Sequence, residues 1–355
     1  MVLSRGDDFP LHQTPEPVAS PGPDRNFYDR YFFNGYAPDG SGFFAVAFGV
    51  YPALDVVDAH FCAIRGNIQH CLHASRRMGD ERLDLTCGPI RIEILEPLQS
   101  LRIVVEGEGL SADLTFTGRA FPIEEPRFSW QVGGHTVMDY TRLTQNGHYQ
   151  GWIEVDGEKT TLTAGTCGTR DRSWGIRPVG TRDPDRTGIS QFFWQWTPVN
   201  FPDRSAFFHL NAHQDGTAWN TRGVIVADGA DATRHVDVET ALLDTALAPG
   251  SRWPAKATLM LGDEALTFTP VGRFQMRGLG YTSPTWGHGI DHGILAVERE
   301  DIDLSTIDPA RPDNLHVQMI CRVTSASGEE GTGTFEQLAI GPYGLLGLTG
   351  LTDPA

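Results

Sequence analysis

The sequence predicts an all-β protein, built from two antiparallel β-barrel or sandwich units in tandem. The chain of 355 residues contains 40 Gly and 23 Pro, spread along its whole length. They divide the chain into many short segments, a composition typical of all-β proteins. The segments follow one another about every ten residues, a spacing that favours an antiparallel meander over strands alternating with helices. Comparable sets of segments lie on both sides of a glycine-rich motif near the middle of the chain.

The first half of the chain begins with a polar stretch. Residues 1–26 are rich in Pro, Asp and Ser, and we expect them to form an extended arm. An aromatic-dense run then starts at Asn26 and is divided by the turn Pro38-Asp-Gly-Ser-Gly42, which predicts the first strands. Short segments bounded by Gly, Pro or Asp predict further strands at 59–73, 83–86, 90–95, 101–106, 112–117 and 147–157.

The second half shows the same pattern. Strands are predicted at 191–197, 206–213, 223–228, 257–261, 266–271, 289–299, 315–324 and 332–340, and only residues 236–247 have a sustained helical stripe. Pro178, Gly180, Pro184 and Gly188 cluster between the two sets of strands. We therefore expect a boundary near residue 180, with one domain at 27–180 and another at 181–355.

The motif between the two sets is Gly165-Thr-Cys-Gly-Thr-Arg-Asp-Arg-Ser-Trp-Gly-Ile-Arg177. Its glycines permit tight or left-handed backbone conformations, so we interpret it as a built turn that follows a β-hairpin. Charges of opposite sign beside an indole indicate an ion pair packed under an aromatic ring.

Asp171 has two interpretations. As the ionised partner of the neighbouring Arg170, Arg172 and Arg177 it would have a lowered pKa and a structural role, and Trp174 would be a wedge between the domains. In an apolar, Trp-lined site the pKa of Asp171 would instead be raised, and the carboxyl could act as a general acid.

The motif and the strand before it resemble a known superfamily. Gly-x-Arg-Asp-x-Ser-Trp-Gly-x-Arg, preceded by Gly-His-Tyr-Gln-Gly-Trp-Ile-Glu-Val-Asp-Gly157, is similar to the carotenoid 1,2-hydratase (hydroxyneurosporene synthase) superfamily, with its AttH-like and lipocalin-like Diels–Alderase relatives. Arg172 stands where members usually have His. The resemblance implies two lipocalin-like domains in tandem. It also implies hydration, dehydration, isomerisation or a pericyclic step on an isoprenoid or polyketide-like substrate.

Composition excludes several classes of function. Lys and Arg number 28 against 45 Asp and Glu, a formal charge of -17, which disfavours nucleic acids and anionic membrane surfaces as partners. The N-terminus lacks the apolar core of a signal peptide, and the most apolar run, at 43–54, is too short to span a membrane. We expect a cytoplasmic protein. Its five cysteines, which we expect to be reduced and buried, are Cys62, Cys71, Cys87, Cys167 and Cys321.

Polar residues on otherwise apolar strands mark the candidate site. Along 206–213 one face carries Phe207, His209, Asn211 and His213, which suits either a pocket or a solvated outer surface. The candidate proton or hydrogen-bond donors are His148, Tyr149, His209, His213, Asp291 and His292, with Asp171 in its second interpretation. The candidate substrate-binding residues are Trp152, Trp194, Trp196, Asn211 and Trp286.

Neither a metal nor a nucleotide cofactor is expected. His209 and His213 are four apart on a strand, about 13 Å at 3.3 Å per residue, which is too far for shared ligation. His288 and His292 lie among glycines and are interpreted as loop residues at a barrel mouth. The chain also lacks the glycine-rich phosphate loops and the Gly-x-Ser-x-Gly motif.

Three functions therefore remain. The first is a cofactor-independent enzyme that acts on a hydrophobic, unsaturated small molecule, with an apolar cavity and one or two acids or hydrogen-bond donors. The second is a lipocalin-like carrier of the same kind of ligand. The third is a carbohydrate-recognising β-sandwich. The oligomeric state stays open.

Overall fold

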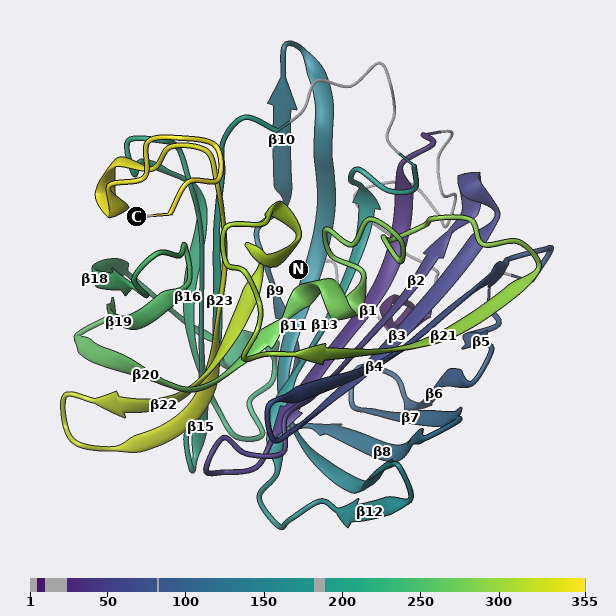
Figure 1. Ribbon diagram of the computed structural model, residues 1–355. Coiled ribbons are helices and arrows are strands. Elements are labelled where there is room, and N and C mark those ends of the chain that lie inside the picture. Colours follow the sequence, from purple (N-terminus) through teal and green to yellow (C-terminus); the bar gives the residue numbers. More distant parts are fainter. Residues whose placement is uncertain (1–4, 10–23, 82, 182–188, 355) are drawn as a thin grey trace.

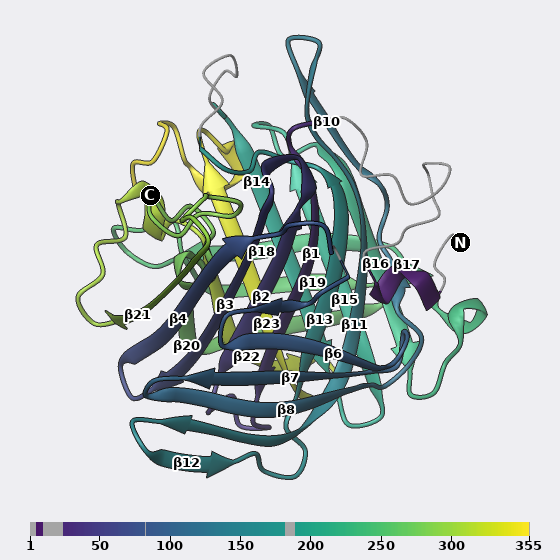
Figure 2. The same ribbon diagram turned by 90° about the vertical axis from the view of Figure 1, so that its right-hand side faces the viewer.

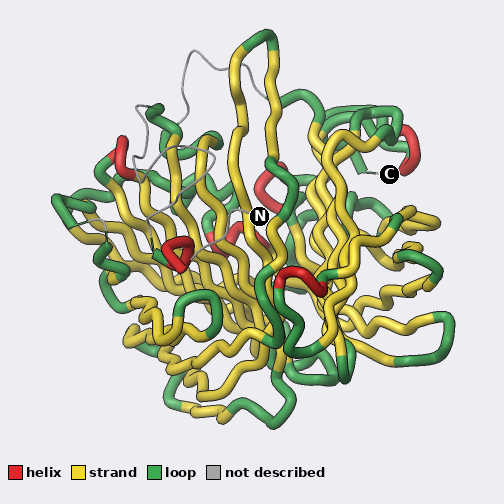
Figure 3. The backbone as a smooth tube through the Cα atoms, turned by 180° about the vertical axis from the view of Figure 1, so that it is seen from behind, coloured by secondary structure: helices red, strands yellow, loops and turns green. Residues whose placement is uncertain are grey.

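The protein is built almost wholly from strands, as the sequence predicted (Figure 1). The computed structural model describes residues 5–9, 24–81, 83–181 and 189–354. Most of the expected N-terminal arm, and Pro184 and Gly188 of the expected boundary, lie outside the described residues. The described helical elements are short 3-10 turns, shown in red in Figure 3: η1 (Arg5–Asp8), η2 (Pro52–Leu54), η3 (Ala232–Arg234), η4 (Met276–Leu279), η5 (Pro312–Asn314) and η6 (Gly344–Leu346).

The first sheet contains all described strands before residue 180 and one later strand. Its main order is β21-β4-β3-β2-β1-β13-β11-β8-β7-β6-β5, with β9, β10 and β12 paired to β11, and Figure 2 shows this sheet from its side of the molecule. Its strands are β1 (Phe27–Tyr36), β2 (Phe44–Tyr51), β3 (Val56–Arg65), β4 (Ile68–Arg77), β5 (Thr86–Cys87), β6 (Ile90–Glu96), β7 (Ser100–Gly107), β8 (Leu110–Gly118), β9 (Ile123–Glu124), β10 (Phe128–Val132), β11 (His135–Val155), β12 (Glu158–Thr161), β13 (Cys167–Ile176) and β21 (Leu295–Asp303).

The second sheet has the order β17-β16-β15-β14-β23-β22-β20-β19-β18. Its strands are β14 (Phe192–Asn200), β15 (Arg204–Ala212), β16 (Ala218–Ala227), β17 (Val236–Val238), β18 (Thr240–Leu247), β19 (Pro254–Leu261), β20 (Glu264–Gln275), β22 (Val317–Ser325) and β23 (Glu330–Ile340). Residues 236–247, the stretch with a helical stripe, thus form β17 and β18. Among the described residues no helix is long and apolar enough to cross a membrane.

Both sheets are curled and antiparallel, and they pack against each other through β1, β11 and β13 of the first sheet and β14, β15 and β23 of the second (Figure 1). Each curled sheet holds an apolar core of its own, and a third buried layer lies between the two sheets. Strand alternation divides the residues among these layers. On β1, Tyr31 and Phe33 lie in the core of the first sheet, whereas Phe32 faces the second sheet.

The central motif is a strand and not a turn. Ten of its residues form β13, which pairs with β1 on one side and β11 on the other. Its glycines allow the neighbouring strands to approach closely. A Cβ atom on Gly168 would collide with the carbonyl oxygen of Asn34, and a Cβ atom on Gly175 would collide with the carbonyl oxygen of Asp139. The motif is therefore part of the layer that joins the two sheets.

One described strand does not lie in the sheet formed by its own half of the chain. Strand β21, from the second half, pairs along its whole length with β4 of the first sheet. Sheet membership therefore does not follow the chain halves, and the boundary near residue 180 stays a prediction.

Candidate functional site

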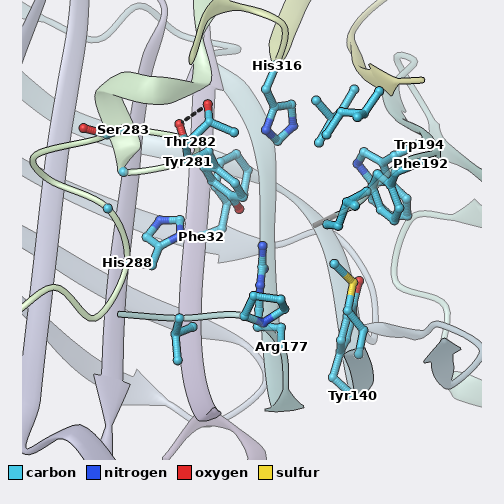
Figure 4. Close-up of a pocket in the computed structure, with 18 of the residues that line it drawn as sticks. Phe32, Tyr140, Arg177, Phe192, Trp194, Tyr281, Thr282, Ser283, His288 and His316 are labelled. Atoms are coloured by element: carbon cyan, nitrogen blue, oxygen red, sulfur yellow. Dashed lines mark hydrogen bonds between the residues drawn. The ribbon is translucent and has the colours of Figure 1, made fainter. Parts of the chain in front are cut away.

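A cavity of about 280 Å³ lies between the two sheets, near the end of β13. This volume is close to the lower end of the range for small-molecule sites. One wall is aromatic and aliphatic and another is polar, as Figure 4 shows. The apolar lining includes Phe32, Met138, Tyr140, Ile189, Phe192, Trp194, Trp196, Leu338 and Ile340. The polar lining includes Arg142, Asp171, Arg177, Tyr281, Thr282, Ser283, His288, His316 and Glu336.

Strand register explains why Asp171 faces this cavity. On β13, Asp171 lies opposite Phe32 of β1 and opposite Thr144 of β11, and all three point toward the second sheet. The next residues on either side, Arg170 and Arg172, therefore point into the first sheet.

The expected ion pairs of Asp171 with Arg170 and Arg172 are accordingly wrong. The guanidinium of Arg170 pairs with Asp8, and that of Arg172 with Asp29, both buried on the opposite side of β13. Trp174, which we expected between the domains, also lies on that side and packs against Leu98 and Leu143.

Asp171 has a raised pKa and not the lowered one that its neighbours in sequence indicated. Burial is the main cause and raises the pKa of the carboxyl to about 6, against the attraction of Arg142 and Arg30 and with the repulsion of Glu125 and Glu336. Within the described part of the chain, no hydrogen bond or ion pair engages its carboxylate. The group is thus able to hold a proton near neutral pH and faces open space.

Glu336 is an ionised carboxylate on the opposite wall. It accepts hydrogen bonds from Trp194 Nε1 at 3.1 Å, His316 Nε2 at 2.7 Å and Gln318 Nε2 at 2.6 Å. Burial alone would raise the pKa of Glu336, but these donors, above all His316, hold it below its usual value. Three donors therefore keep this carboxylate charged and fixed in place.

Glu125 is a second buried carboxylate behind the cavity wall. It accepts hydrogen bonds from the hydroxyl of Thr144 and, at 3.2 Å, from Trp196 Nε1. Arg142 approaches it to 3.5 Å and His209 Nδ1 to 3.8 Å. Glu125 thus orients one tryptophan and one arginine of the cavity.

His288 is held as a neutral imidazole. Arg30 donates to His288 Nδ1 at 2.8 Å, which must therefore accept, and the other ring nitrogen donates to the Leu279 carbonyl at 2.7 Å. Burial, together with the charges of Arg30 and Arg177, places the pKa of His288 well below its usual value. The ring is a fixed polar surface and not an acid.

The loop after η4 contains a residue in an unusual conformation. Thr282 lines the cavity with a φ of 56°, in the left-handed region that β-branched residues rarely adopt. Such conformations cost on the order of 1–3 kcal/mol and cluster at functional sites.

Three of the residues predicted from sequence meet in this cavity: Asp171, Trp194 and Trp196. His209 and Asn211 also face the first sheet, but His209 lies behind Glu125, and the amide of Asn211 donates to the Phe193 carbonyl.

The remaining candidates lie elsewhere, and their roles stay predictions. His213 and His148 are exposed, Tyr149 is in the core of the first sheet, and Trp152 lies under the ammonium of Lys159 at 3.5 Å.

Asp291, His292 and Trp286 lie in the loop before β21, where Trp286 is buried and Asp291 is exposed. Asp291 pairs with Arg77 at 2.6 Å, and the His292 ring stacks on Trp286 with centroids 4.1 Å apart.

Sequence reasoning missed most of the polar lining. Glu336 and His316 are polar residues in strand-like surroundings, a signal that was available. Arg177 was noted only as a motif arginine near Asp171, and Arg142 carried no signal. In the described ranges, no group of three or more His, Cys, Asp or Glu side chains is arranged to hold a metal ion, and the five cysteines are buried and unpaired.

Comparison with solved structures confirms the superfamily resemblance at the level of the fold. An AttH-like protein from Nitrosomonas europaea superimposes with a TM-score of 0.54 at 13% identity, over 88% of this chain and 92% of that one. CghA, solved with Sch210972, gives 0.50 at 12% identity, over 89% of each chain. Kievitone hydratase from Nectria haematococca gives 0.45 at 12% identity, over 88% of this chain and 89% of that one.

No curated protein matches the chain. A family model matches residues 3–349, which is nearly the whole sequence, and the chain therefore belongs to this family of unknown function, DUF8625.

Proposed function

We propose that this protein is an enzyme that works without a cofactor on a hydrophobic, unsaturated small molecule bound between its two sheets. The observation that carries the proposal is Asp171, a carboxyl with a pKa of about 6 that faces an aromatic cavity without a partner among the described residues. An acid with a pKa near the working pH is suited to general acid catalysis. CghA, which shares the fold, has been solved with a small molecule, Sch210972.

In this mechanism the protonated carboxyl of Asp171 gives its proton to one carbon of a substrate double bond. The neighbouring carbon becomes electron-deficient, and the aromatic wall that includes Phe192 and Trp194 stabilises the positive charge. Attack by water and return of a proton to the Asp171 carboxylate complete a hydration, while transfer of a different substrate proton to that carboxylate completes an isomerisation. Isoprenoid and polyketide-like molecules are the substrate classes that fit an aromatic wall.

The test is proton transfer into product. The protein should be incubated with unsaturated isoprenoid and polyketide-like compounds in heavy water, and the products examined by mass spectrometry for carbon-bound deuterium. Asp171→Asn should lower turnover by about 10²- to 10⁴-fold. Asp113→Asn is the matched control, because Asp113 lies far along the first sheet and pairs with Arg102 at 2.7 Å. Tight ligand binding with no turnover in either protein would instead indicate a carrier.

A further inference from the structure

The cavity has a positive side that lacks a balancing acid. Arg177 follows directly after β13 and lines the cavity, with its guanidinium carbon 5.3 Å from the ring centre of Tyr28 and 5.7 Å from that of Tyr281. In the ranges that the structure describes, no carboxylate lies within ion-pair distance of this guanidinium.

Several other buried arginines are paired with carboxylates. In a chain with 45 acidic and 28 basic residues, carboxylates are plentiful, yet Arg177 is partly buried beside the cavity without one among the described residues. The paired ones are Arg119 with Asp228, Arg142 with Glu125, Arg170 with Asp8 and Arg172 with Asp29.

A second cation strengthens the positive side. The guanidinium carbon of Arg30 lies 4.3 Å from the ring centre of Tyr281, the ring that Arg177 also approaches. The hydrogen bond of Arg30 to His288 involves a neutral partner, and Arg30 also attracts the carboxyl groups of Asp58 and Asp171. Both cations lower the pKa of His288, so their field extends to the cavity wall.

Glu336 and the His316 that bonds it lie on the other side of the cavity from Arg177. Glu336 and Glu125 both raise the pKa of Asp171, against the attraction of Arg142 and Arg30. In Figure 4, Arg177 and His316, which bonds Glu336, point into the cavity from opposite sides, and Phe192 and Trp194 form the wall between them. Arg177 and the Glu336–His316 pair thus lie on opposite sides of the cavity, with the aromatic wall between them.

We propose that the ligand of this cavity is an amphiphilic acid, whose carboxylate, enolate or phenolate oxygen binds Arg177 and whose hydrocarbon body lies against the Phe192 and Trp194 wall. The inference rests on the proposed function, because it names the substrate class of the same cavity. Guanidinium groups bind planar anionic oxygens in a two-pronged geometry, which also fixes orientation. The double bond of such a ligand would then point toward Asp171, and its negative charge would raise the pKa of that carboxyl further.

The test compares two molecules of equal skeleton. Geranic acid is ionised at pH 7.5 and geranamide is neutral, and their dissociation constants can be measured by titration calorimetry. We expect the wild-type protein to bind the acid about 10- to 100-fold more tightly than the amide. Arg177→Gln should remove this difference without changing the affinity for the amide, and Arg177→Lys should keep part of it. Arg91→Gln, on the outer surface of β6, is the control and should behave as wild type.

Equal affinity for acid and amide, or a loss of both in Arg177→Gln, would overturn the inference. Bromide gives a measurement that does not depend on the organic skeleton: in soaked crystals its anomalous signal should appear beside Arg177 in the wild type and vanish in Arg177→Gln. If neither organic probe binds, the bromide experiment tests the inference by itself. The absence of bromide beside Arg177 in the wild type would then overturn the inference. Asp171→Asn separates the two proposals, because anion binding at Arg177 requires no turnover.

Discussion

Asp171 and Arg172 are neighbours in the chain, yet their side chains lie in different layers of the molecule. Asp171 faces the cavity between the sheets, and Arg172 pairs with Asp29 inside the first sheet. Because side chains alternate between the two faces of β13, adjacent residues of the motif have different roles. Arg170 and Arg172 tie together the interior of the first sheet, and Asp171 is left without a cation in contact.

Asp171→Asn should stabilise the protein at neutral pH. The pKa of Asp171 is about 6 in the folded protein and close to 3.8 in an unfolded chain, so the folded state binds this proton more tightly. The contribution of Asp171 to the free energy of unfolding therefore falls as the pH rises from about 4 to about 6. Above about pH 6 this contribution no longer changes. Asn cannot ionise, and at pH 7.5 the variant should gain about 1 to 3 kcal/mol over wild type.

Urea denaturation at pH 5 and pH 7.5 measures this gain, which should shrink at the lower pH. Asp113→Asn, in a partly exposed ion pair, serves as the control. A variant less stable than wild type at pH 7.5 would show that Asp171 has a stabilising partner after all.

Asp8 has the structural role that the sequence assigned to Asp171. Its carboxylate is fully buried, pairs with Arg170 and accepts a hydrogen bond from the backbone of Leu98. Asp8→Asn would leave the Arg170 guanidinium buried without a counter-charge, at a cost of about 3–5 kcal/mol. Thermal and urea denaturation would measure the loss. Unchanged stability would mean that the N-terminal turn contributes nothing to the first sheet.

The proposed acid predicts the direction of the pH dependence. Turnover requires the protonated form of Asp171, so kcat/KM should be level below pH 6 and fall about tenfold per pH unit above it. Asp171→Asn should abolish this dependence along with most of the activity. A rate that rises through pH 6 would instead identify the carboxylate as a base.

The fold class could be predicted from sequence because it depends on local signals. Gly and Pro mark the ends of short strands, and alternation marks their two faces, so the split of 206–213 into an apolar face and one with His209 and Asn211 agrees with the structure. The glycines of β13 misled the interpretation, because close packing of strands and tight turns both favour glycine.

The site could be predicted only in small part, because it depends on how two sheets meet. Alternation tells which residues share a face but not what covers that face. Glu336 on β23, Arg142 on β11 and Arg177 after β13 come together only once the sheets pack. The pairing of β21 with β4 is likewise a long-range choice that no local pattern encodes.

His209 and His213 offer a matched pair for the last prediction, since both were expected to contact ligand. His209 is fully buried, bonds Asn220 at 3.2 Å and approaches Glu125 at 3.8 Å, and burial lowers its pKa. His209→Ala leaves a void and unpaired polar groups, so it should cost about 2–3 kcal/mol. His213 is exposed, and His213→Ala should change stability by less than about 0.5 kcal/mol.

Urea denaturation of the two variants compares these effects, and titration with geranic acid measures ligand affinity. If both variants keep full stability and only His209→Ala loses affinity, His209 contacts the ligand as the sequence predicted, and the cavity extends past Glu125.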